Sequence, residues 1–274
     1  MKPIKAKLQG DRRFEEDANR YAAYLETPEG RLRVDLAIRN VQEFLPRSAR
    51  AKGLRALDLG CGTGIAAVRL ARLGIHVTLL DRSATMLALA ERAIAEAGLT
   101  DKVTVKQGDC SQLADILPRG SFDIILCHNL FEYVVDPGAV LQAAVRLMRQ
   151  ASATVSVLVR NQAGEVLKAA LQGGDLVAAR NNLTTEWGQE SLYGGRVRLF
   201  TPVAVEALLK GASLSILARR GVRVIADYLP ERVSREREYQ RIFRLECELG
   251  KRQEFFGVAR YMHCLASRAT LGSG

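Results

Sequence analysis

Three glycines and two aspartates in one short stretch of the chain have the types and spacing to bind a small polar ligand. Gly60, Gly62 and Gly64 follow a short apolar run, and glycine lets a backbone turn tightly and approach a ligand without a clash from Cβ. Asp58 precedes the first glycine by two residues, and Asp81 ends the next apolar run. A carboxylate accepts hydrogen bonds from hydroxyl groups and pairs with ammonium groups. The stretch therefore predicts a site for a ligand that carries such groups.

The elements around these residues have the pattern of a βαβ unit. Residues 55–59 are apolar and ended by glycine, as expected of a strand buried in a parallel sheet. Residues 66–73 follow with helical spacing, and residues 76–80 form a second strand that ends on Asp81. In such a unit the acid at the tip of the second strand commonly hydrogen-bonds a ribose hydroxyl, while the glycine loop holds the neighbouring part of the ligand. Asp81 is therefore predicted to bind ribose.

The spacing Asp-x-Gly-x-Gly-x-Gly distinguishes this loop from other glycine loops. A Gly-x-Gly motif alone also occurs in nicotinamide and flavin proteins, and a structural glycine turn is a further alternative. With Asp58 included, the stretch resembles the signature of class I S-adenosylmethionine-dependent methyltransferases. That cofactor carries an ammonium group and a sulfonium but no pyrophosphate, so a carboxylate beside the loop suits it better than it suits NAD. The resemblance implies S-adenosylmethionine as the cofactor and methyl transfer as the reaction.

The same resemblance implies further cofactor contacts. A guanidinium at Arg33 would clamp the cofactor's carboxylate, although a solvated helix position is the alternative for this residue. Arg82 and Met86 are placed against the adenosine, and Asp109 against the adenine amino group. His128 is expected to contact the cofactor or to orient the methyl acceptor, or it is a histidine satisfied by the protein alone. The predicted cofactor-binding residues are Arg33, Asp58, Gly60, Cys61, Gly62, Gly64, Asp81, Arg82, Met86, Asp109, Cys110 and His128.

The patterns of the whole chain predict an α/β protein with a doubly wound seven-stranded sheet, the Rossmann-like fold of class I methyltransferases. Helical spacing at the start predicts an N-terminal helical cap over residues 1–48. The S-adenosylmethionine-binding methyltransferase domain is expected over 49–274, with an insertion of helices and loop at about 161–215. Further strands are predicted at 103–107, 122–127, 153–159, 216–217, 222–225 and 261–266, and a helix at 231–249.

Composition narrows the classes of protein to which this chain can belong. The 274 residues carry 40 Lys and Arg against 30 Asp and Glu, a net charge of +10. No apolar run reaches the ~18 residues needed to cross a bilayer, and the charged start lacks the apolar core of a signal peptide, so we expect a cytoplasmic protein with no membrane partner. Five scattered cysteines and three histidines show no metal-ligand spacing. A basic protein attracts polyanions, above all nucleic-acid phosphates; the alternative is a basic composition without a nucleic-acid role.

Several stretches of the chain resemble a narrower family. They are residues 30–33, the glycine loop, and residues 128–137, 161–164, 221–229 and 260–263, of which the last two lie outside the shared cofactor fold. Over Arg33 to Ala266 the chain resembles the bacterial tRNA 5-carboxymethoxyuridine methyltransferases, which esterify the carboxylate of a wobble uridine. The resemblance implies tRNA as the partner. It also implies an acceptor that is ionised at neutral pH, which needs cations to hold it rather than a general base.

The residues predicted to act on the acceptor are His128, Tyr133, Arg198 and Arg223. Arg198 and Arg223, with Arg160, are candidates to hold a carboxylate, while Tyr133 and Trp187 are candidates to stack on an unpaired anticodon base. For the arginines a solvated surface position is the alternative, and for Tyr133 a place in the core.

Two competing hypotheses remain at this stage. A small-molecule O- or N-methyltransferase would take a phenol, alcohol or amine as acceptor and would need a base, for which His128 and His263 are the candidates. A protein that binds the cofactor without turnover is the other.

Overall fold

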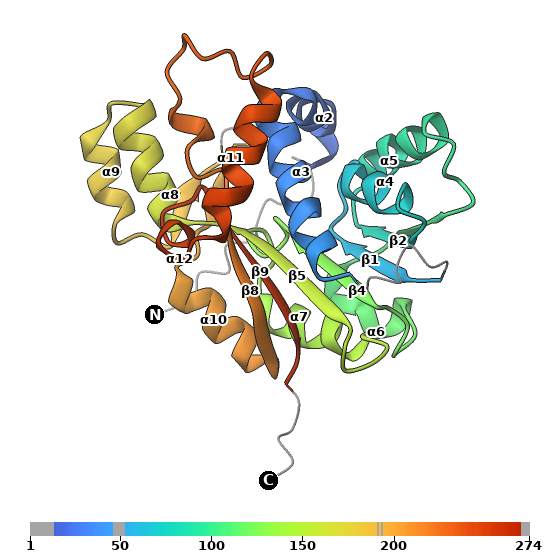
Figure 1. Cartoon of the computed structure of the whole chain (residues 1–274). Coiled ribbons are helices and arrows are strands. Elements are labelled where there is room, and N and C mark those ends of the chain that lie inside the picture. Colours follow the sequence, from blue (N-terminus) through green and yellow to red (C-terminus); the bar gives the residue numbers. More distant parts are fainter. Residues whose placement is uncertain (1–13, 46–52, 191, 193, 270–274) are drawn as a thin grey trace.

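A seven-stranded sheet forms the centre of the computed structural model, which describes residues 14–45, 53–190, 192 and 194–269 (Figure 1). Its strands are β1 (Arg55–Leu59), β2 (His76–Asp81), β3 (Val103–Gln107), β4 (Ile124–His128), β5 (Thr154–Arg160), β8 (Leu214–Val222) and β9 (Tyr261–Arg268). The strand order is β3-β2-β1-β4-β5-β9-β8. The first five strands are parallel, and β9 lies antiparallel between β5 and β8. The predicted doubly wound sheet of seven strands is confirmed.

Helices cover both faces of the sheet. They are α2 (Ala18–Glu26), α3 (Pro28–Glu43), α4 (Ile65–Ala71), α5 (Ala84–Glu96), α6 (Leu113–Ile116), α7 (Pro137–Arg146), α8 (Gln162–Leu167), α9 (Leu176–Asn182), α10 (Pro202–Gly211), α11 (Tyr239–Lys251) and α12 (Gln253–Phe256). Figure 1 shows α3, α4 and α5 on one face of the sheet and α6, α7 and α10 on the other. Within the described residues, no helix has the length and apolar character to cross a membrane.

Alternating side chains of the central strands build the two layers of core. Leu57 and Leu59 of β1 join an apolar cluster that includes Leu141 of α7 and Leu209 of α10. Ala56, which points to the opposite face, joins a second cluster with residues of α3, α4 and α5. Because both faces are covered, the strands read as continuous apolar runs, the feature from which they were predicted.

Side-chain caps start several helices. The hydroxyl of Ser83 accepts a hydrogen bond from the Met86 amide at 3.1 Å, which begins α5. Thr201 does the same for the Ala204 amide at 3.2 Å, with Pro202 in the first turn of α10. Thr27 caps α3 in the same way. Each cap satisfies an amide that has no partner within its own helix.

Several predicted boundaries in the last third of the chain are wrong. The strand expected at 216–217 is part of the longer strand β8, whose pairing with β9 shifts register between Ile216 and Ala218. The register shift interrupts the alternation of side chains and hides the continuous strand from the sequence. Of the strand expected at 222–225 only Val222 belongs to β8, and residues 223–225 turn away from the sheet. The helix expected over 231–249 begins only at Tyr239.

The insertion expected at about 161–215 contains a feature that helical periodicity did not indicate. Besides α8, α9, α10 and a π-helical turn, η3 (Lys168–Gln172), it holds an antiparallel ribbon of β6 (Trp187–Gln189) and β7 (Arg196–Arg198). Strands of three residues are too short to show a period. The predicted domain boundary between residues 48 and 49 falls outside the described residues, so the division into cap and domain stays a prediction.

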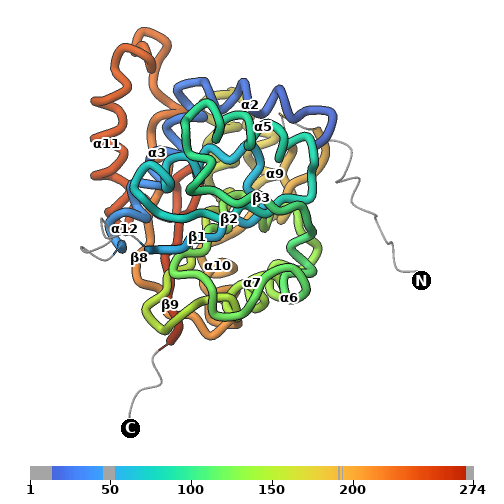
Figure 2. Tube along the Cα trace, turned by 90° about the vertical axis from the view of Figure 1, so that its right-hand side faces the viewer, coloured from blue at the N-terminus to red at the C-terminus, as the bar shows by residue number. Residues whose placement is uncertain are grey.

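The N-terminal helices and the insertion meet at the end of the sheet where the parallel strands finish. In Figure 2, α2 lies beside α5, as their contacts also indicate, and α8 follows directly from the last residue of β5. In open α/β sheets, ligands bind at this carboxyl edge. The elements therefore enclose the place where a site is expected.

Candidate active site

A cavity of about 1070 Å³ opens at the carboxyl edge of the sheet. Its lining includes the glycine loop, the ends of β2 and β4, the N-terminal helices, and residues of the insertion and of the β8–β9 end of the sheet. It brings together eleven of the predicted site residues and the further candidate Arg160. The eleven are Arg33, Gly60, Gly62, Asp81, Arg82, Met86, Asp109, Cys110, His128, Tyr133 and Arg223.

The glycine loop approaches its neighbours too closely for any other residue type. Gly60 has a φ of 67°, and a Cβ there would lie 2.8 Å from Leu130 Cδ1. Gly64 has a φ of 71°, and a Cβ there would lie 2.9 Å from the Cβ of Ala90 in α5. Gly60 and Gly62 line the cavity, whereas Cys61 and Gly64 do not. The last two therefore shape the loop and do not face the cavity.

Two carboxylates lie beneath this loop in different environments. Asp81 accepts hydrogen bonds from the amides of Gly62 and Ser83 at 2.9 and 3.0 Å, so it ties the loop to the start of α5. Asp58 is buried, and its Oδ2 has no hydrogen-bond partner among the described residues. Burial, with the charge of Asp81 nearby, raises the pKa of Asp58 to about 7. A buried acid without a partner marks a position prepared for a cation or a donor from a ligand.

Arg33 presents a buried cation to the same cavity. Its Nη2 donates a hydrogen bond to the Tyr21 hydroxyl at 2.8 Å, and its guanidinium lies 5.3 Å from the centre of the Tyr24 ring and 5.6 Å from that of Tyr261. No carboxylate of the described residues lies within ion-pair distance of Arg33, which is only 5% exposed. A guanidinium keeps its proton in proteins, so this buried charge lacks a protein counter-ion.

The other predicted cofactor residues continue around the cavity from β2 to β3. Asp109, which follows β3, accepts a hydrogen bond from the Ser111 amide at 2.7 Å. Partial burial raises its pKa, but the hydrogen bonds from Ser111 outweigh that effect and hold the pKa of Asp109 below its ordinary value. Arg82, Met86 and Cys110 line the cavity beside it.

His128 ends β4 and belongs to a hydrogen-bonded chain that runs into the sheet. Its Nε2 lies 2.8 Å from Ser156 Oγ, which lies 2.7 Å from His263 Nε2, and His263 Nδ1 lies 3.1 Å from Asn40 Nδ2. Burial lowers the pKa of His128 to about 3, and burial lowers the pKa of His263 well below its usual range. His263 is fully buried and does not line the cavity. Both imidazoles are therefore neutral at physiological pH.

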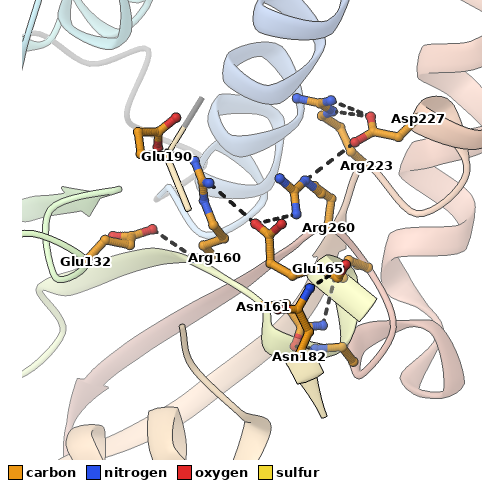
Figure 3. Close-up of polar contacts among 12 residues, drawn as sticks. Glu132, Arg160, Asn161, Glu165, Asn182, Glu190, Arg223, Asp227 and Arg260 are labelled. Atoms are coloured by element: carbon orange, nitrogen blue, oxygen red, sulfur yellow. Dashed lines mark hydrogen bonds and ion pairs between the residues drawn. The ribbon is translucent and has the colours of Figure 1, made fainter. Parts of the chain in front are cut away.

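The half of the cavity beyond Arg33 is built from a chain of alternating charges (Figure 3). Glu165 lies between Arg160 and Arg260, with nitrogen–oxygen distances of 3.4 and 2.6 Å. Asp227 lies between Arg260, at 3.6 Å, and Arg223, whose Nε lies 2.7 Å away. At the other end of the chain the Nη2 of Arg160 lies 2.6 Å from Glu190 Oε2. All six side chains are buried.

Tyr261 reports the electrostatic potential of this cluster. It begins β9, lines the cavity and is 3% exposed. Burial alone would raise its pKa, but the four guanidinium groups of Arg33, Arg160, Arg223 and Arg260 lower the pKa of Tyr261 to about 8. The acids of the cluster therefore do not fully offset the guanidinium groups, and the remaining positive potential at Tyr261 favours an anion.

A strained turn places Arg223 in the cluster. Arg223 leaves β8 with a φ of 59°, a conformation that is uncommon for a residue with a long side chain. The buried carboxylate of Glu246, in α11, holds the turn by accepting hydrogen bonds from the amides of Val224, Ile225 and Ala226 at 2.7 to 2.9 Å. The Nη1 of Arg223 donates to the Tyr24 hydroxyl at 2.8 Å. Helices from both ends of the chain thus position this guanidinium.

The remaining predicted acceptor residues lie at or outside the cavity rim. The Tyr133 hydroxyl donates to Glu190 Oε2 at 3.0 Å, and its ring packs edge-on against Phe14. Arg198 and Trp187 belong to the ribbon and do not line the cavity. The Nη1 of Arg198 donates to the Val134 carbonyl at 3.3 Å, and Val134 does line it.

Sequence reasoning missed five residues of the charged half, which are Lys168, Glu190, Asp227, Arg260 and Tyr261. Asp227, Arg260 and Tyr261 fall within stretches that carry the narrower resemblance, which was a signal for them. Lys168 and Glu190 belong to no motif. Only the fold shows that they reach the cavity.

Comparison with known proteins identifies the family. Residues 50–194 match the family described as a methyltransferase domain, which covers more than half of the chain. The chain belongs to this methyltransferase family. Its cofactor is S-adenosylmethionine, and the predicted class I methyltransferase assignment is confirmed.

Individual relatives of this methyltransferase differ in how much of it they match. The tRNA 5-carboxymethoxyuridine methyltransferase of Escherichia coli K12 is 27% identical over 94% of this chain and 97% of its own length. The ubiquinone biosynthesis O-methyltransferase of Methylococcus capsulatus is 35% identical, but over 44% of this chain and 51% of its own length. A solved S-adenosylmethionine-dependent methyltransferase of Thermotoga maritima shares the fold, with a TM-score of 0.61 and 16% identity over 94% of this chain and 99% of that one.

The groups in the cavity of this methyltransferase fit its cofactor. S-adenosylmethionine carries an ammonium group, a carboxylate and ribose hydroxyls. The cavity offers the carboxylate of Asp81 beside a close-packed glycine loop, and the guanidinium of Arg33, which has no counter-ion among the described residues. The unpartnered oxygen of Asp58 is buried beneath the loop and is not part of the cavity lining. Each charged end of the cofactor thus has an opposite charge available.

Proposed function

We propose that this methyltransferase esterifies the carboxylate of 5-carboxymethoxyuridine at the wobble position of tRNA. The observation that carries the proposal is the row of buried guanidinium groups from Arg160, Arg223 and Arg260 in the half of the cavity away from the glycine loop. The extent of the similarity also supports it, because the E. coli tRNA methyltransferase matches this chain along 94% of its length.

In this proposal the cofactor occupies the half of the cavity formed by the ends of β1 to β4. Arg33 binds its carboxylate, Asp58 its ammonium group and Asp81 its ribose. Gly60 and Gly62 let the backbone approach it, with Cys61 and Gly64 shaping the loop, while Arg82, Met86, Asp109 and Cys110 surround the adenine. When bound, S-adenosylmethionine supplies a methyl carbon activated by a positively charged sulfur.

The protein's remaining task is to hold a carboxylate and exclude water. An ionised carboxylate is already a nucleophile, so alignment and desolvation carry most of the work. Arg160, Arg223 and Arg260 provide a positive potential that attracts the anion. Because acidic partners hold them in place, they orient it without moving. Neutral His128, which is held by its hydrogen bond with Ser156, lies between the two halves of the site. In this proposal it shapes the cavity and does not act as a base.

The β6–β7 ribbon is proposed to contact the tRNA at the rim. Arg196 and Arg198 lie over the ring of Trp187 at 4.8 and 5.3 Å from its centre, and Arg196 is exposed. Guanidinium groups stacked on an aromatic ring pair with phosphates and stack on bases. The net charge of +10 attracts a polyanion such as tRNA and favours its association with the protein.

A small-molecule O-methyltransferase is the second candidate, because the ubiquinone biosynthesis O-methyltransferases match the cofactor-binding part of this chain. A phenol acceptor must lose a proton during transfer, so such an enzyme needs a base. Neither predicted base suits that role here, because the pKa of His128 is too low and His263 is remote from the cavity. The charged half of the cavity therefore favours the carboxylate acceptor.

Methyl transfer to RNA tests the proposal. The purified enzyme is incubated with labelled S-adenosylmethionine and total bacterial tRNA that has not been methylated at this position. The tRNA is then digested and its nucleosides are analysed by mass spectrometry. We expect a methyl ester of 5-carboxymethoxyuridine that mild alkali removes. Label in a small phenol, but none in tRNA, would establish the second candidate instead.

A further inference from the structure

Five of the cations that line the cavity fall into two groups when their carboxylate partners among the described residues are compared. Arg160, Arg223 and Arg260 form ion pairs with Glu190, Asp227 and Glu165. Each of these acids is already held by a guanidinium group. The three arginines therefore each have a carboxylate partner within the protein.

Arg33 and Lys168 are different. Neither has a carboxylate of the described residues within ion-pair distance, although both line the cavity. The Lys168 ammonium makes no hydrogen bond to any described residue, and the side chain is half-buried. A partly buried ammonium without a partner is costly unless a ligand supplies the negative charge. Arg33 and Lys168 are thus two cavity-lining cations that no carboxylate of the described residues neutralises, and Arg33 is assigned to the cofactor's carboxylate.

The position of Lys168 separates it from the cofactor's half of the cavity. The acids proposed to hold the cofactor lie in or just after β1, β2 and β3, at one side of the sheet. Lys168 begins the π-helical turn η3, in the insertion that follows β5, and η3 packs against η4 (Ala226–Tyr228) beyond β8. It therefore reaches the cavity from the side of the arginine cluster.

The surroundings of Lys168 carry excess positive charge. Burial and the nearby charges of Arg260 and Arg160 lower the pKa of Lys168, and the attraction of Glu165 does not compensate for them. Glu165 already lies 2.6 Å from Arg260 and 3.4 Å from Arg160. An anion that entered beside Lys168 would relieve this repulsion.

We propose that Lys168 is the residue that binds the carboxylate of the methyl acceptor and makes the enzyme specific for an acidic acceptor. This inference rests on the proposed function. Lys168 donates to the carboxylate, while the paired arginines maintain the potential around it. The ammonium thereby distinguishes 5-carboxymethoxyuridine from uridines that lack the acidic group.

The test compares two anticodon stem-loop RNAs, one with 5-carboxymethoxyuridine at the wobble position and one with unmodified uridine there. Binding of each RNA is measured for the wild type and for Lys168→Met in the presence of S-adenosylhomocysteine. Hydrogen bonds to charged groups contribute enough for about a tenfold change in affinity. We expect Lys168→Met to lose about tenfold of the preference for the modified RNA, and to bind the cofactor as the wild type does.

Two further variants serve as controls. Lys210→Met removes the same charge from an exposed position on α10 and is expected to keep the preference. Lys168→Arg retains a cation and is expected to restore most of it. The inference is overturned if Lys168→Met keeps the preference for the modified RNA. It is also overturned if the variant keeps that preference but loses affinity for the cofactor. If instead the wild type neither prefers nor methylates the modified RNA, the proposed function itself fails.

Discussion

At the scale of single residues, the buried carboxyl group of Asp58 lowers the stability of the folded protein when it is ionised. Its carboxyl group is 3% exposed and its Oδ2 lacks a partner, and burial raises its pKa to about 7. Because the folded-state pKa is higher than the value of 3.8 for an accessible aspartate, its contribution to stability is full below pH 3.8 and is lost as the pH rises through 7. At neutral and alkaline pH the buried carboxylate therefore carries a costly charge, which a cationic ligand group would neutralise.

The substitution Asp58→Asn separates these two effects. At pH 8 we expect the variant without cofactor to be more stable than the wild type by about 1–2 kcal/mol, since the buried charge is gone while the amide still has some desolvation cost. At pH 5 the carboxyl of the folded wild type is largely protonated, so the difference should be clearly smaller. Thermal and denaturant unfolding at both pH values measure this.

Cofactor binding gives the other half of that prediction. Calorimetric titration should show about a tenfold weaker affinity of Asp58→Asn for S-adenosylmethionine at pH 8, because the ammonium loses its counter-charge. A variant that is less stable at both pH values, or one that binds the cofactor normally, would contradict the role assigned to Asp58.

Sequence alone indicates this half of the site more fully than the other, for which it named Arg160 and Arg223 but missed Arg260 and Lys168. Asp58, Gly60 and Asp81 lie within a single βαβ unit, whose local spacing carries the information. Arg160 and Arg260, in contrast, meet because β5 and β9 pair antiparallel, so that Arg160 lies opposite Tyr261. Nothing in the spacing of two arginines a hundred residues apart indicates that contact.

At the scale of elements, the β6–β7 ribbon connects the outside of the molecule to the cavity rim. The Arg198 amide donates to the Glu132 carbonyl at 3.2 Å, and its guanidinium donates to the carbonyls of Val134 and Val135. Val134 and Val135 line the cavity. The ribbon thus supports the segment between β4 and α7, while Arg196 on the same ribbon lies over Trp187 and remains exposed.

Substitutions on the ribbon should therefore divide into two kinds. Arg196→Met is expected to weaken tRNA binding several-fold without changing turnover at saturating tRNA, because it removes one phosphate contact. Arg198→Met is expected to lower turnover as well, because the rim segment loses its support. Steady-state kinetics with tRNA measures both effects, and Arg119→Met, at an exposed position, is the matched loss of charge. Equal effects of all three variants would show that the ribbon makes no specific contact.

Among the elements, the predictable ones are those whose periodicity is complete. The strands β1 to β5 lie close to their expected positions, because burial on both faces produces apolar runs. The ribbon and the β8 irregularity were missed, since a three-residue strand and a register shift leave no period in the sequence. The charged half of the cavity is lined by residues such as Arg160, Arg223 and Arg260, which come from elements far apart in the sequence, so local patterns reveal the cofactor better than the substrate.

At the scale of the whole molecule, charge should distinguish the two ligands. The proposed cofactor contacts are buried or lie inside the cavity, where salt screens them little. A tRNA bound across the ribbon would instead be held by exposed cations and by the net charge of +10, and phosphate contacts of that kind release counter-ions on binding. We therefore expect kcat/KM for tRNA to fall by at least about tenfold between roughly 50 and 200 mM salt.

The affinity for S-adenosylmethionine should change less than about twofold over the same range, because screening acts mainly on exposed charges. Measuring both quantities in one salt series provides an internal control, since a general loss of structure would lower the two together. A kcat/KM that stays constant while transfer proceeds would mean that the exposed arginines do not contact the acceptor. The basic composition would then be unrelated to RNA, and the buried cluster around Arg260 would have to recognise a small acidic molecule by itself.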